Sequence, residues 1–246
     1  MTHVFYSAAA TDASVGGELL LDGDEGHHAV KVRRITVGEQ VEVVDGRGTR
    51  ACGSVSEVRK DSCTVSVESI EHEPVASPAV TVVQALTKKD RSDQAIELLT
   101  EVGVDVVLPW RAQRSVTSEV PAKWARIVVE SCKQSRRARF PRVHDLAVTD
   151  AVVAFLNEQK SAGAQVLVCH ESATVPMSQV LQTAASAYVI VIGPEGGLTD
   201  DELQAFTGAG ADVVKLGPSV LRAATAGAVA ASIVSALSTR WSATKE

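Results

Sequence analysis

The sequence predicts an α/β protein with a mostly parallel sheet, preceded by a small all-β unit. Three observations lead to this fold class. The first seventy or so residues alternate short apolar runs with turn signals, and two closely spaced prolines then interrupt the pattern. Beyond them, continuous apolar runs are separated by stretches of helical periodicity. Strands that alternate with helices are typical of crossover units and a parallel sheet, whose buried strands are apolar along their whole length.

Short strands are predicted in the amino-terminal part, for example over residues 40–44 and 63–67, because apolar and polar residues alternate there. Asp45-Gly46-Arg47-Gly48 supplies a turn directly after the first of these runs. Pro74 and Pro78 then fix φ and remove backbone donors from a segment that could otherwise pair. We therefore expect two domains, over residues 1–73 and 74–246.

Five apolar runs predict the strands of the second domain, over residues 80–85, 104–108, 166–169, 188–192 and 213–216. Apolar residues at helical spacing predict helices over residues 95–102 and 121–132, and Gly103 gives the first of them a stop. No internal repeat and no low-complexity segment is present in the sequence.

The composition is that of an ordinary globular protein, with 45% hydrophobic residues, 22% charged residues and a formal net charge of −6. It excludes intrinsic disorder as the main state. The longest apolar stretch, residues 187–193, falls far short of the ~20 residues that span a bilayer. With no export signal, we expect a cytoplasmic protein without membrane association and with its four cysteines reduced.

Positive charge is concentrated between Arg111 and Arg142, where nine cations and two anions give a local net charge of +7. Such a basic field on an acidic protein indicates a polyanion site. The alternative is a solvated helix face whose arginines cover apolar surface. We favour the polyanion, because Arg136-Arg137-Ala138-Arg139 is too dense for pairing with acids four residues away.

Two strand-to-glycine junctions are the most specific local features. Ile192-Gly193-Pro194-Glu195-Gly196-Gly197-Leu198 follows one apolar run, and Thr199 with Glu202 then predicts a capping box that begins a helix. Leu216-Gly217-Pro218 follows another run and leads into a helix of small residues over 223–231. Glycines after a strand either satisfy tight turns or let a ligand approach the backbone. Neither junction matches GxGxxG, which disfavours a nicotinamide-dependent oxidoreductase.

These junctions, together with motifs earlier in the chain, resemble the RsmE family of SPOUT-class methyltransferases. Leu221-Arg222 and Thr225-Ala226 after the second junction belong to the resemblance. The supporting motifs occur in the same order as in the family: His27–Arg34 with Gly38 and Asp45–Gly48, Glu97–Val104 followed by Gln113-Arg114-Ser115, and Gln134-Ser135-Arg136 leading to Pro141.

The resemblance implies an enzyme that uses S-adenosyl-L-methionine to methylate N3 of a uridine in the 16S ribosomal RNA of the small subunit. It also implies an α/β domain with a deep trefoil knot, a PUA-like RNA-binding β-barrel before it, and a homodimer whose subunits share the RNA site. We expect no metal, because His27 and His28, on a predicted strand, would point to opposite faces.

Cofactor contacts are implied for the loop at His170-Glu171, the turn at 193–197 and the segment 216–226. The expected residues are His170, Glu171, Ile192, Gly193, Pro194, Glu195, Gly196, Gly197, Leu216, Gly217, Leu221, Arg222, Thr225 and Ala226. Ile192, Leu216 and Leu221 would form an apolar wall for the adenine. A valine at Gly196 is expected to abolish cofactor binding by blocking the approach to the backbone.

Methylation at N3 of uridine requires that its proton leave, which calls for a base or for a cation that stabilises the uracil anion. Arg222, Arg114 and Arg136 are the expected cations, because a guanidinium stays charged and can fork onto a carbonyl. Glu195 is either a base or an acid that caps nearby backbone donors. The residues expected to contact RNA are His28, Lys31, Arg33, Arg34, Arg114, Arg136, Arg137 and Arg139.

The chain departs from the family pattern at two positions. Ser219 and Ala224 stand where the family usually has an arginine and a glutamate. This departure motivates an alternative function, a catalytically silent RNA-binding or ribosome-assembly factor that keeps the fold. Calorimetry with S-adenosylmethionine separates the two hypotheses, because a silent factor of this kind releases no heat of binding.

Overall fold

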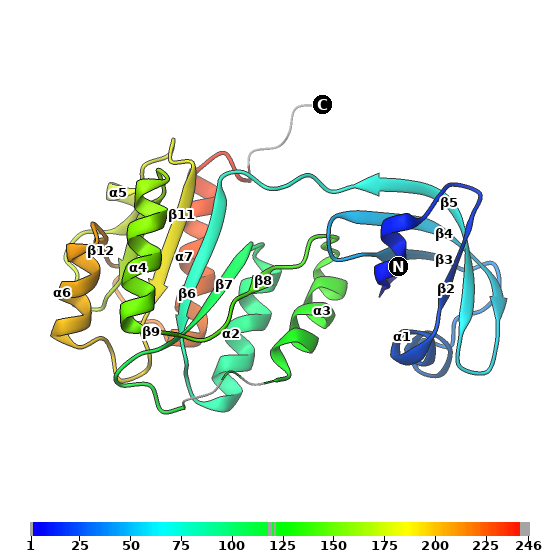
Figure 1. The fold of residues 1–246 in the computed structure, drawn as a ribbon, viewed down its shortest axis with the longest axis horizontal. Coiled ribbons are helices and arrows are strands. Elements are labelled where there is room, and N and C mark those ends of the chain that lie inside the picture. Colours follow the sequence, from blue (N-terminus) through cyan, green and yellow to red (C-terminus); the bar gives the residue numbers. More distant parts are fainter. Residues whose placement is uncertain (1, 118–119, 121, 242–246) are drawn as a thin grey trace. The chain divides into compact units, whose positions relative to one another are not determined.

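A computed structural model describes residues 2–117, 120 and 122–241, and Figure 1 shows its ribbon. The chain forms two compact units. The first consists of Met1–Val75 and Val129–Phe140, and the second consists of Ala76–Val128 and Pro141–Glu246. The segment 129–140 therefore packs with the amino-terminal unit, although the sequence placed it in the second domain. The residues that this segment packs against are far away in the sequence, so no local sequence pattern indicates the packing.

The first unit is built on a five-stranded sheet in the order β1-β3-β4-β5-β2, in which β1 and β3 are parallel and the other pairs are antiparallel. Its strands are β1 (His3–Tyr6), β2 (Glu18–Leu21), β3 (Gln40–Val44), β4 (Thr49–Val58) and β5 (Cys63–His72). A 3-10 helix, η1 (Ala8–Asp12), follows β1. Alternate apolar residues such as Phe5, Val43 and Val65 point into one core, as strand periodicity requires.

A helical segment in the first unit corrects the strand expected at His27 and His28. The α-helix α1 (Gly23–His27) runs directly into a π-helical turn, η2 (His28–Arg33), which ends at Arg34 with a left-handed φ of 56°. The strand was expected because this segment lies within a part of the chain that was predicted to be all-β. Tertiary packing overrides that expectation, because Ala29 on this helix is buried in the core of the unit.

The second unit is an α/β sandwich. Its sheet has the order β12-β10-β11-β6-β7-β8, with β9 also pairing to β7, and every pair is parallel. The elements from β6 onward, in chain order, are β6 (Ala79–Ala85), α2 (Lys89–Glu101), β7 (Val106–Arg111), α3 (Trp124–Ser135), β8 (Arg142–Val143), β9 (Ala147–Val148), α4 (Thr149–Ser161), β10 (Gln165–Cys169), α5 (Met177–Val180), β11 (Ala187–Ile192), α6 (Asp200–Gly208), β12 (Asp212–Val214) and α7 (Ala223–Leu237). Helix α3 begins in the second unit, and its residues from Val129 onward belong to the first. The predicted parallel sheet is confirmed. Residue 121, where the helix predicted over residues 121–132 was expected to begin, lies outside the described residues.

Helices cover both faces of this sheet (Figure 1). Helices α4 and α6 contact each other, and α4 contacts β10, whereas α7 contacts β6, β11 and α2. Alternate residues of one strand face opposite layers: Val189 and Val191 join the core cluster that contains Phe206 of α6. Ile192 lies 3.5 Å from the position of a Cβ on Gly227 of α7. Burial on both faces explains why these strands are apolar throughout.

Candidate active site

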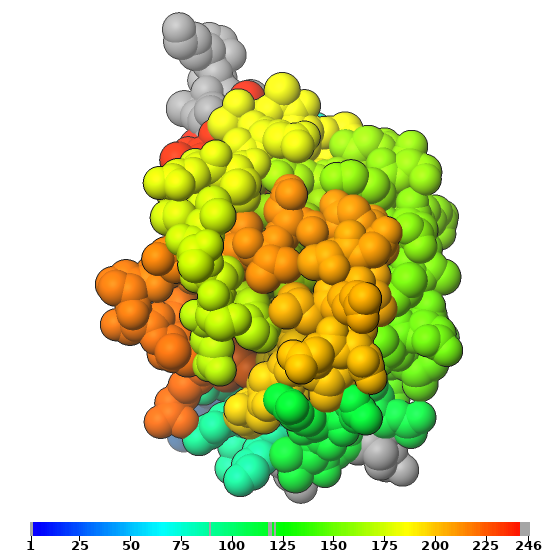
Figure 2. All heavy atoms as spheres, turned by 90° about the vertical axis from the view of Figure 1, so that its left-hand side faces the viewer, coloured from blue at the N-terminus to red at the C-terminus, as the bar shows by residue number. Residues whose placement is uncertain are grey.

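The two glycine junctions meet at one edge of the parallel sheet. The segments after β10, β11 and β12 all leave from the carboxyl ends of their strands, where α/β proteins commonly bind ligands. Strand β10 lies between β11 and β12, so the two junctions are not on adjacent strands. They nevertheless line one cavity of about 410 Å³, within the ~300–1,000 Å³ typical of small-molecule sites. Figure 2 shows the face of the second unit on which α4 and α6 lie; the segment near residues 217–222 is at the left edge, in darker orange.

The structure brings together nearly all the residues expected to contact the cofactor. Thirteen of the fourteen line the cavity: His170, Glu171, Ile192, Gly193, Pro194, Glu195, Gly196, Gly197, Leu216, Gly217, Leu221, Arg222 and Ala226. Thr225 does not, since its hydroxyl and backbone N–H both donate to the carbonyl oxygen of Arg222 in the first turn of α7. The cavity wall also contains Pro218, Ser219, Val220 and Ala223, which belong to the expected segment 216–226. Four further lining residues lie outside the expected cofactor segments: Arg91, Cys169, Leu198 and Lys215.

The turn after β11 is a rigid loop followed by a capped helix. Gly197 has a φ of +72°, and its N–H donates to the carbonyl of Pro194 at 2.9 Å. Thr199 accepts from the backbone of Glu202, and Glu202 accepts in return from the backbone of Thr199, which confirms the capping box. The second oxygen of the Glu202 carboxylate accepts from the N–H of Gln113 at 2.7 Å. This buried acid therefore joins the loop after β7 to the start of α6.

Arg114 supports the loop from outside the cavity. Its Nη1 donates to the carbonyl oxygens of Gly196 at 3.0 Å and Leu198 at 3.1 Å. The arginine is absent from the residues that line the cavity wall. The geometry thus gives Arg114 a structural task at the loop.

Glu195 links the same loop to the start of α2. Its Oε1 accepts from the backbone N–H of Lys88, the N-cap residue of α2, at 3.3 Å. The same oxygen lies 3.5 Å from Nη1 of Arg91. Of the two roles that the sequence left open, these contacts match the cap of backbone donors. The sequence did not single out Arg91, although a polar and charged run, Thr87–Arg91, directly follows a buried strand.

Polar and apolar surfaces both contribute to the cavity. Ile192, Leu216 and Leu221 provide the expected apolar surface, and His170 is held by its Nδ1, 2.8 Å from the hydroxyl of Ser172. Burial raises the pKa of the Cys169 thiol to about 12. The thiol is therefore neutral and unreactive at physiological pH, and it acts as a small apolar group of the wall.

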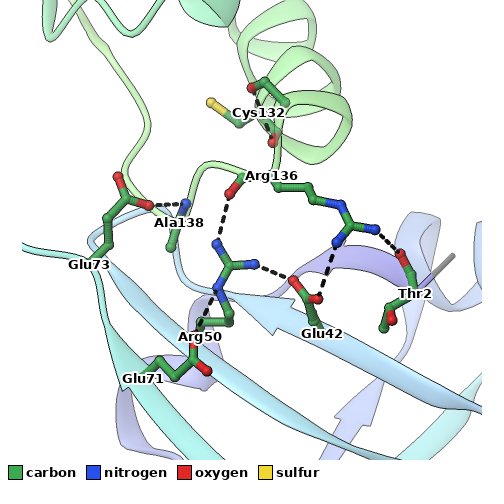
Figure 3. Close-up of polar contacts among 9 residues, drawn as sticks. Thr2, Glu42, Arg50, Glu71, Glu73, Cys132, Arg136 and Ala138 are labelled. Carbon is green, nitrogen blue, oxygen red and sulfur yellow. Dashed lines mark hydrogen bonds and ion pairs between the residues drawn. The ribbon is translucent and has the colours of Figure 1, made fainter. Parts of the chain in front are cut away.

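The basic segment after α3 is held to the first unit by a polar network (Figure 3). Arg50 donates to the carbonyl oxygen of Arg136 at 2.7 Å and forms an ion pair with Glu42. The Arg136 side chain lies 3.9 Å from Glu42 and donates to the carbonyl of Thr2. Glu73 accepts from the backbone of Ala138 at 2.6 Å.

Several cations of this segment have acidic or carbonyl partners far away in the sequence. The buried Nζ of Lys133 lies 2.7 Å from Glu25 and 3.0 Å from Glu130. The Nε of Arg139 donates to the carbonyl of Glu73 at 2.7 Å, and Arg137 also has a partner. The charge free to meet a polyanion is therefore smaller than the local count of +7 suggests. Half of the Arg136 side chain is still exposed.

Four of the residues expected to contact RNA lie on or next to η2: His28, Lys31, Arg33 and Arg34. Arg33 donates to Nε2 of His28 at 3.2 Å, and Lys31 lies 3.9 Å from Asp61. Burial lowers the pKa of His28 below its ordinary value of 6.5, and the nearby Lys133 lowers it further. His28 is therefore neutral at pH 7, while Lys31, Arg33 and Arg34 keep exposed charges.

Within residues 2–117, 120 and 122–241, no group of three or more histidine, cysteine, aspartate or glutamate side chains is arranged to hold a metal ion. No helix in the same part of the chain is long and apolar enough to cross a membrane.

The class of protein that has this parallel α/β sheet, ligand cavity and small β-rich unit is identified by the family models as an RNA methyltransferase. Residues 75–235 match the model of the RNA methyltransferase domain, and residues 21–68 match that of the RNA methyltransferase PUA domain. The chain is 42% identical to ribosomal RNA small subunit methyltransferase E of Mycobacterium bovis, over 98% of this chain and 94% of the relative. The Bacillus subtilis enzyme is 29% identical over 87% and 88% of the two chains.

Solved structures show the same fold. Ribosomal RNA small subunit methyltransferase E from Neisseria gonorrhoeae, bound to S-adenosyl methionine, superposes with a TM-score of 0.87 at 25% identity, covering 97% of this chain and 98% of the other. A chain from Legionella pneumophila with bound S-adenosyl methionine gives a TM-score of 0.85 at 25% identity and the same coverage. This chain belongs to the ribosomal RNA small subunit methyltransferase E family, within the SPOUT methyltransferases.

Proposed function

We propose that this protein is an S-adenosyl-L-methionine-dependent methyltransferase that methylates N3 of a uridine in the 16S ribosomal RNA of the small subunit. One observation carries the proposal. The cavity at the carboxyl ends of β10, β11 and β12 is lined by the two glycine junctions that belong to the family resemblance, in a chain that matches curated relatives along nearly its whole length.

The cavity fits the cofactor in size and in chemistry. A Cβ built on Gly217 meets no atom within 4 Å, so this glycine leaves open space in the cavity wall. Ile192, Leu216 and Leu221 suit an adenine ring, and backbone groups of the turns at Gly196 and Gly217 suit its polar edges. When bound, S-adenosyl-L-methionine supplies a methyl group on a sulfonium, which needs little covalent help from the protein.

The chain's own residues must bring the uracil to the methyl group and lower the free energy of its anion. Orientation of two bound reactants alone is worth up to ~7–11 kcal/mol. Arg222 lies in the cavity wall at the N-cap of α7, where its charge can stabilise a developing oxyanion. Arg114 contributes indirectly, because it supports the Gly196–Leu198 loop.

The proposal extends to RNA contacts, assembly and location. Lys31, Arg33, Arg34 and the exposed part of Arg136 are the cations best placed to meet phosphates within the first unit. Membership of the family supports a homodimer, a deep trefoil knot in the second unit and a cytoplasmic location. Light scattering on the purified protein measures the dimer directly, and a mass equal to one chain of 25.8 kDa would contradict it.

The decisive experiment supplies substrate and cofactor together. The protein is incubated with S-adenosyl-L-methionine that carries a labelled methyl group and with small ribosomal subunits that lack the modification. We expect label in 16S ribosomal RNA, located at N3 of one uridine by nuclease digestion and mass spectrometry. Binding of subunits without transfer of label, and without heat of cofactor binding, would instead support the silent RNA-binding factor.

A further inference from the structure

Arg91 is a cation in the cavity wall to which the family resemblance gave no role. It lies in the first turn of α2, lines the cavity, and has a side chain that is 39% exposed. One edge of its guanidinium lies 3.5 Å from Glu195. A guanidinium has five N–H donors, so this contact leaves donors free for a ligand.

Hydrogen bonds fix the start of α2, so the backbone position from which the Arg91 side chain extends is well defined. The hydroxyl of Ser92 donates to the carbonyl of Thr87 at 2.9 Å and accepts from the backbone N–H of Thr87 at 3.2 Å. Thr117 donates to the same carbonyl at 3.3 Å. Thr87 and Ser92 are both buried. Functional side chains on such supported helices are placed more accurately than those on free loops.

The cavity remains positively charged when the cofactor is bound. Three cations, Arg91, Lys215 and Arg222, and two carboxylates, Glu171 and Glu195, line it, a net charge of +1, and His170 is the remaining titratable group besides the neutral Cys169 thiol. S-adenosyl-L-methionine has a sulfonium, an ammonium and one carboxylate, and therefore adds a further net charge of +1. This net positive charge favours an anionic group on the second substrate.

We propose that Arg91 contacts the uracil base and stabilises the negative charge that forms when its N3 proton leaves, an inference that rests on the proposed function. The N3–H bond breaks, its proton goes to solvent water or hydroxide, and the electron pair spreads over N3 and the two flanking carbonyl oxygens. The pair on N3 then forms the new N–CH₃ bond while the S–CH₃ bond breaks and its electrons return to sulfur. Arg91 and Arg222 come from different elements, so each can take one of the two oxygens.

The test compares the steady-state methylation of small subunits by wild type, Arg91→Ala and Arg91→Lys between pH 6 and pH 9. Removal of one donor to a developing oxyanion costs about 10²–10³ in kcat. We expect a loss of this size in Arg91→Ala at pH 7, partial recovery as pH rises, because hydroxide then removes the N3 proton more readily, and retention of at least about a tenth of kcat in Arg91→Lys. Lys160→Ala, which removes an exposed cation at the far end of α4, is the matched control and should keep full activity.

Two further measurements separate this role from a structural one. Calorimetry should give the same affinity for S-adenosyl-L-methionine in wild type and Arg91→Ala, and thermal unfolding should confirm the fold. If Arg91 acted only through Glu195, the variants Glu195→Gln and Arg91→Ala would lose the same fraction of kcat, and the double variant would lose no more than either one. The pH profiles of kcat would then be unchanged. If Arg91 bound a phosphate, the KM for RNA would rise with kcat unchanged. Either result overturns the inference, whereas inactivity of the wild type would overturn the proposed function itself.

Discussion

Gly196 and Gly217 have equivalent places in the sequence, each in a turn after a buried strand, but their surroundings differ. A Cβ on Gly196 would lie 3.1 Å from Cβ of Arg114, outside the cavity. A Cβ on Gly217 would meet nothing within 4 Å, and Gly217 has no left-handed φ. Substitution at Gly196 therefore disturbs the support of the loop, whereas substitution at Gly217 adds atoms to an open part of the cavity wall.

Gly217→Val is the cleaner test of cofactor binding. We expect the protein to fold with an unchanged unfolding temperature, because neither sterics nor φ opposes the valine. The affinity for S-adenosyl-L-methionine, measured by calorimetry, should fall by at least about tenfold, equivalent to ~1.4 kcal/mol. Gly208→Val, at another glycine whose Cβ would meet open space, is the control and should bind normally. Normal binding by Gly217→Val would remove the second junction from the site.

His28 offers a test based on pH. Its pKa is lowered in the folded protein by burial and by Lys133, so the unfolded chain takes up a proton at a higher pH than the folded chain. His28 therefore reduces the free energy of unfolding as pH falls below 6.5 toward the lowered folded pKa, and has no such effect above 6.5. We expect urea unfolding at pH 7.5 and pH 5.5 to show a smaller difference in His28→Gln than in wild type.

A comparison of His28 with Arg33 distinguishes the contribution of charge to RNA binding from that of an uncharged contact. Because His28 is neutral at pH 7.5, His28→Gln should leave the salt dependence of RNA affinity unchanged. Arg33→Gln should reduce the slope of log K against log salt by about one unit if Arg33 neutralises a phosphate. An equal reduction in both variants would show that His28 is protonated in the complex.

At the scale of elements, α3 ends in a left-handed turn that has an arginine where glycine is the usual residue. Arg136 has a φ of +58°, and the N–H of Arg137 donates to the carbonyl of Cys132 at 2.9 Å, the longer bond of a Schellman motif. A left-handed conformation costs a residue with a Cβ about 1–2 kcal/mol. Position 136 therefore combines a side-chain charge with a backbone strain, and substitutions can change the two independently.

A pair of substitutions at Arg136 measures these two properties separately. Arg136→Ala and Arg136→Gly both remove the guanidinium, but only glycine relieves the strain. We expect the glycine variant to be more stable than the alanine variant by about 1 kcal/mol in urea unfolding. RNA affinity should fall equally in both variants if the side chain contacts RNA. Unequal affinities would indicate that local folding, not charge, controls binding.

The elements themselves could largely be predicted from the sequence, because their signals are local. Five of the seven strands of the parallel sheet, and the capping box at Thr199 and Glu202, follow from short patterns, and the structure confirms them. The pairing of the basic segment could not be predicted. Arg136 and Lys133 meet Glu42 and Glu25, which lie about a hundred residues away and leave no trace in the local charge count.

The candidate site shows the same division between local and long-range information. The two glycine junctions are visible as motifs, so the residues that line the cavity along them could be named in advance. Arg91 could not, since its place depends on β6 lying beside β11 in the sheet order. The task of Arg114 likewise follows only from carbonyl oxygens that the fold brings to it.

At the scale of the whole molecule, the chain leaves the first unit after Val75 and returns to it with Val129–Phe140. The returning segment contributes Ala138 and Phe140 to a small apolar cluster with Val4 and Val44. It also brings Lys133 to Glu25, at 2.7 Å. The amino-terminal piece alone, residues 1–75, has little core in reserve, because domains of up to ~70–80 residues rarely gain more than ~3–5 kcal/mol from burial. Its stability should therefore depend on both pieces.

Fragments of the chain test this dependence. We expect residues 1–75 alone to show no cooperative urea transition, since Glu25 and the cluster around Val44 lose their partners. The same fragment joined to residues 129–140 by a flexible Gly/Ser linker should unfold cooperatively, because the linker supplies an effective concentration in the millimolar range. Lys133→Met in the fused fragment should lower the free energy of unfolding by about 3 kcal/mol, as expected when one partner of a buried ion pair is removed. A cooperative transition of equal midpoint in residues 1–75 alone would show that the amino-terminal unit folds without the returning segment.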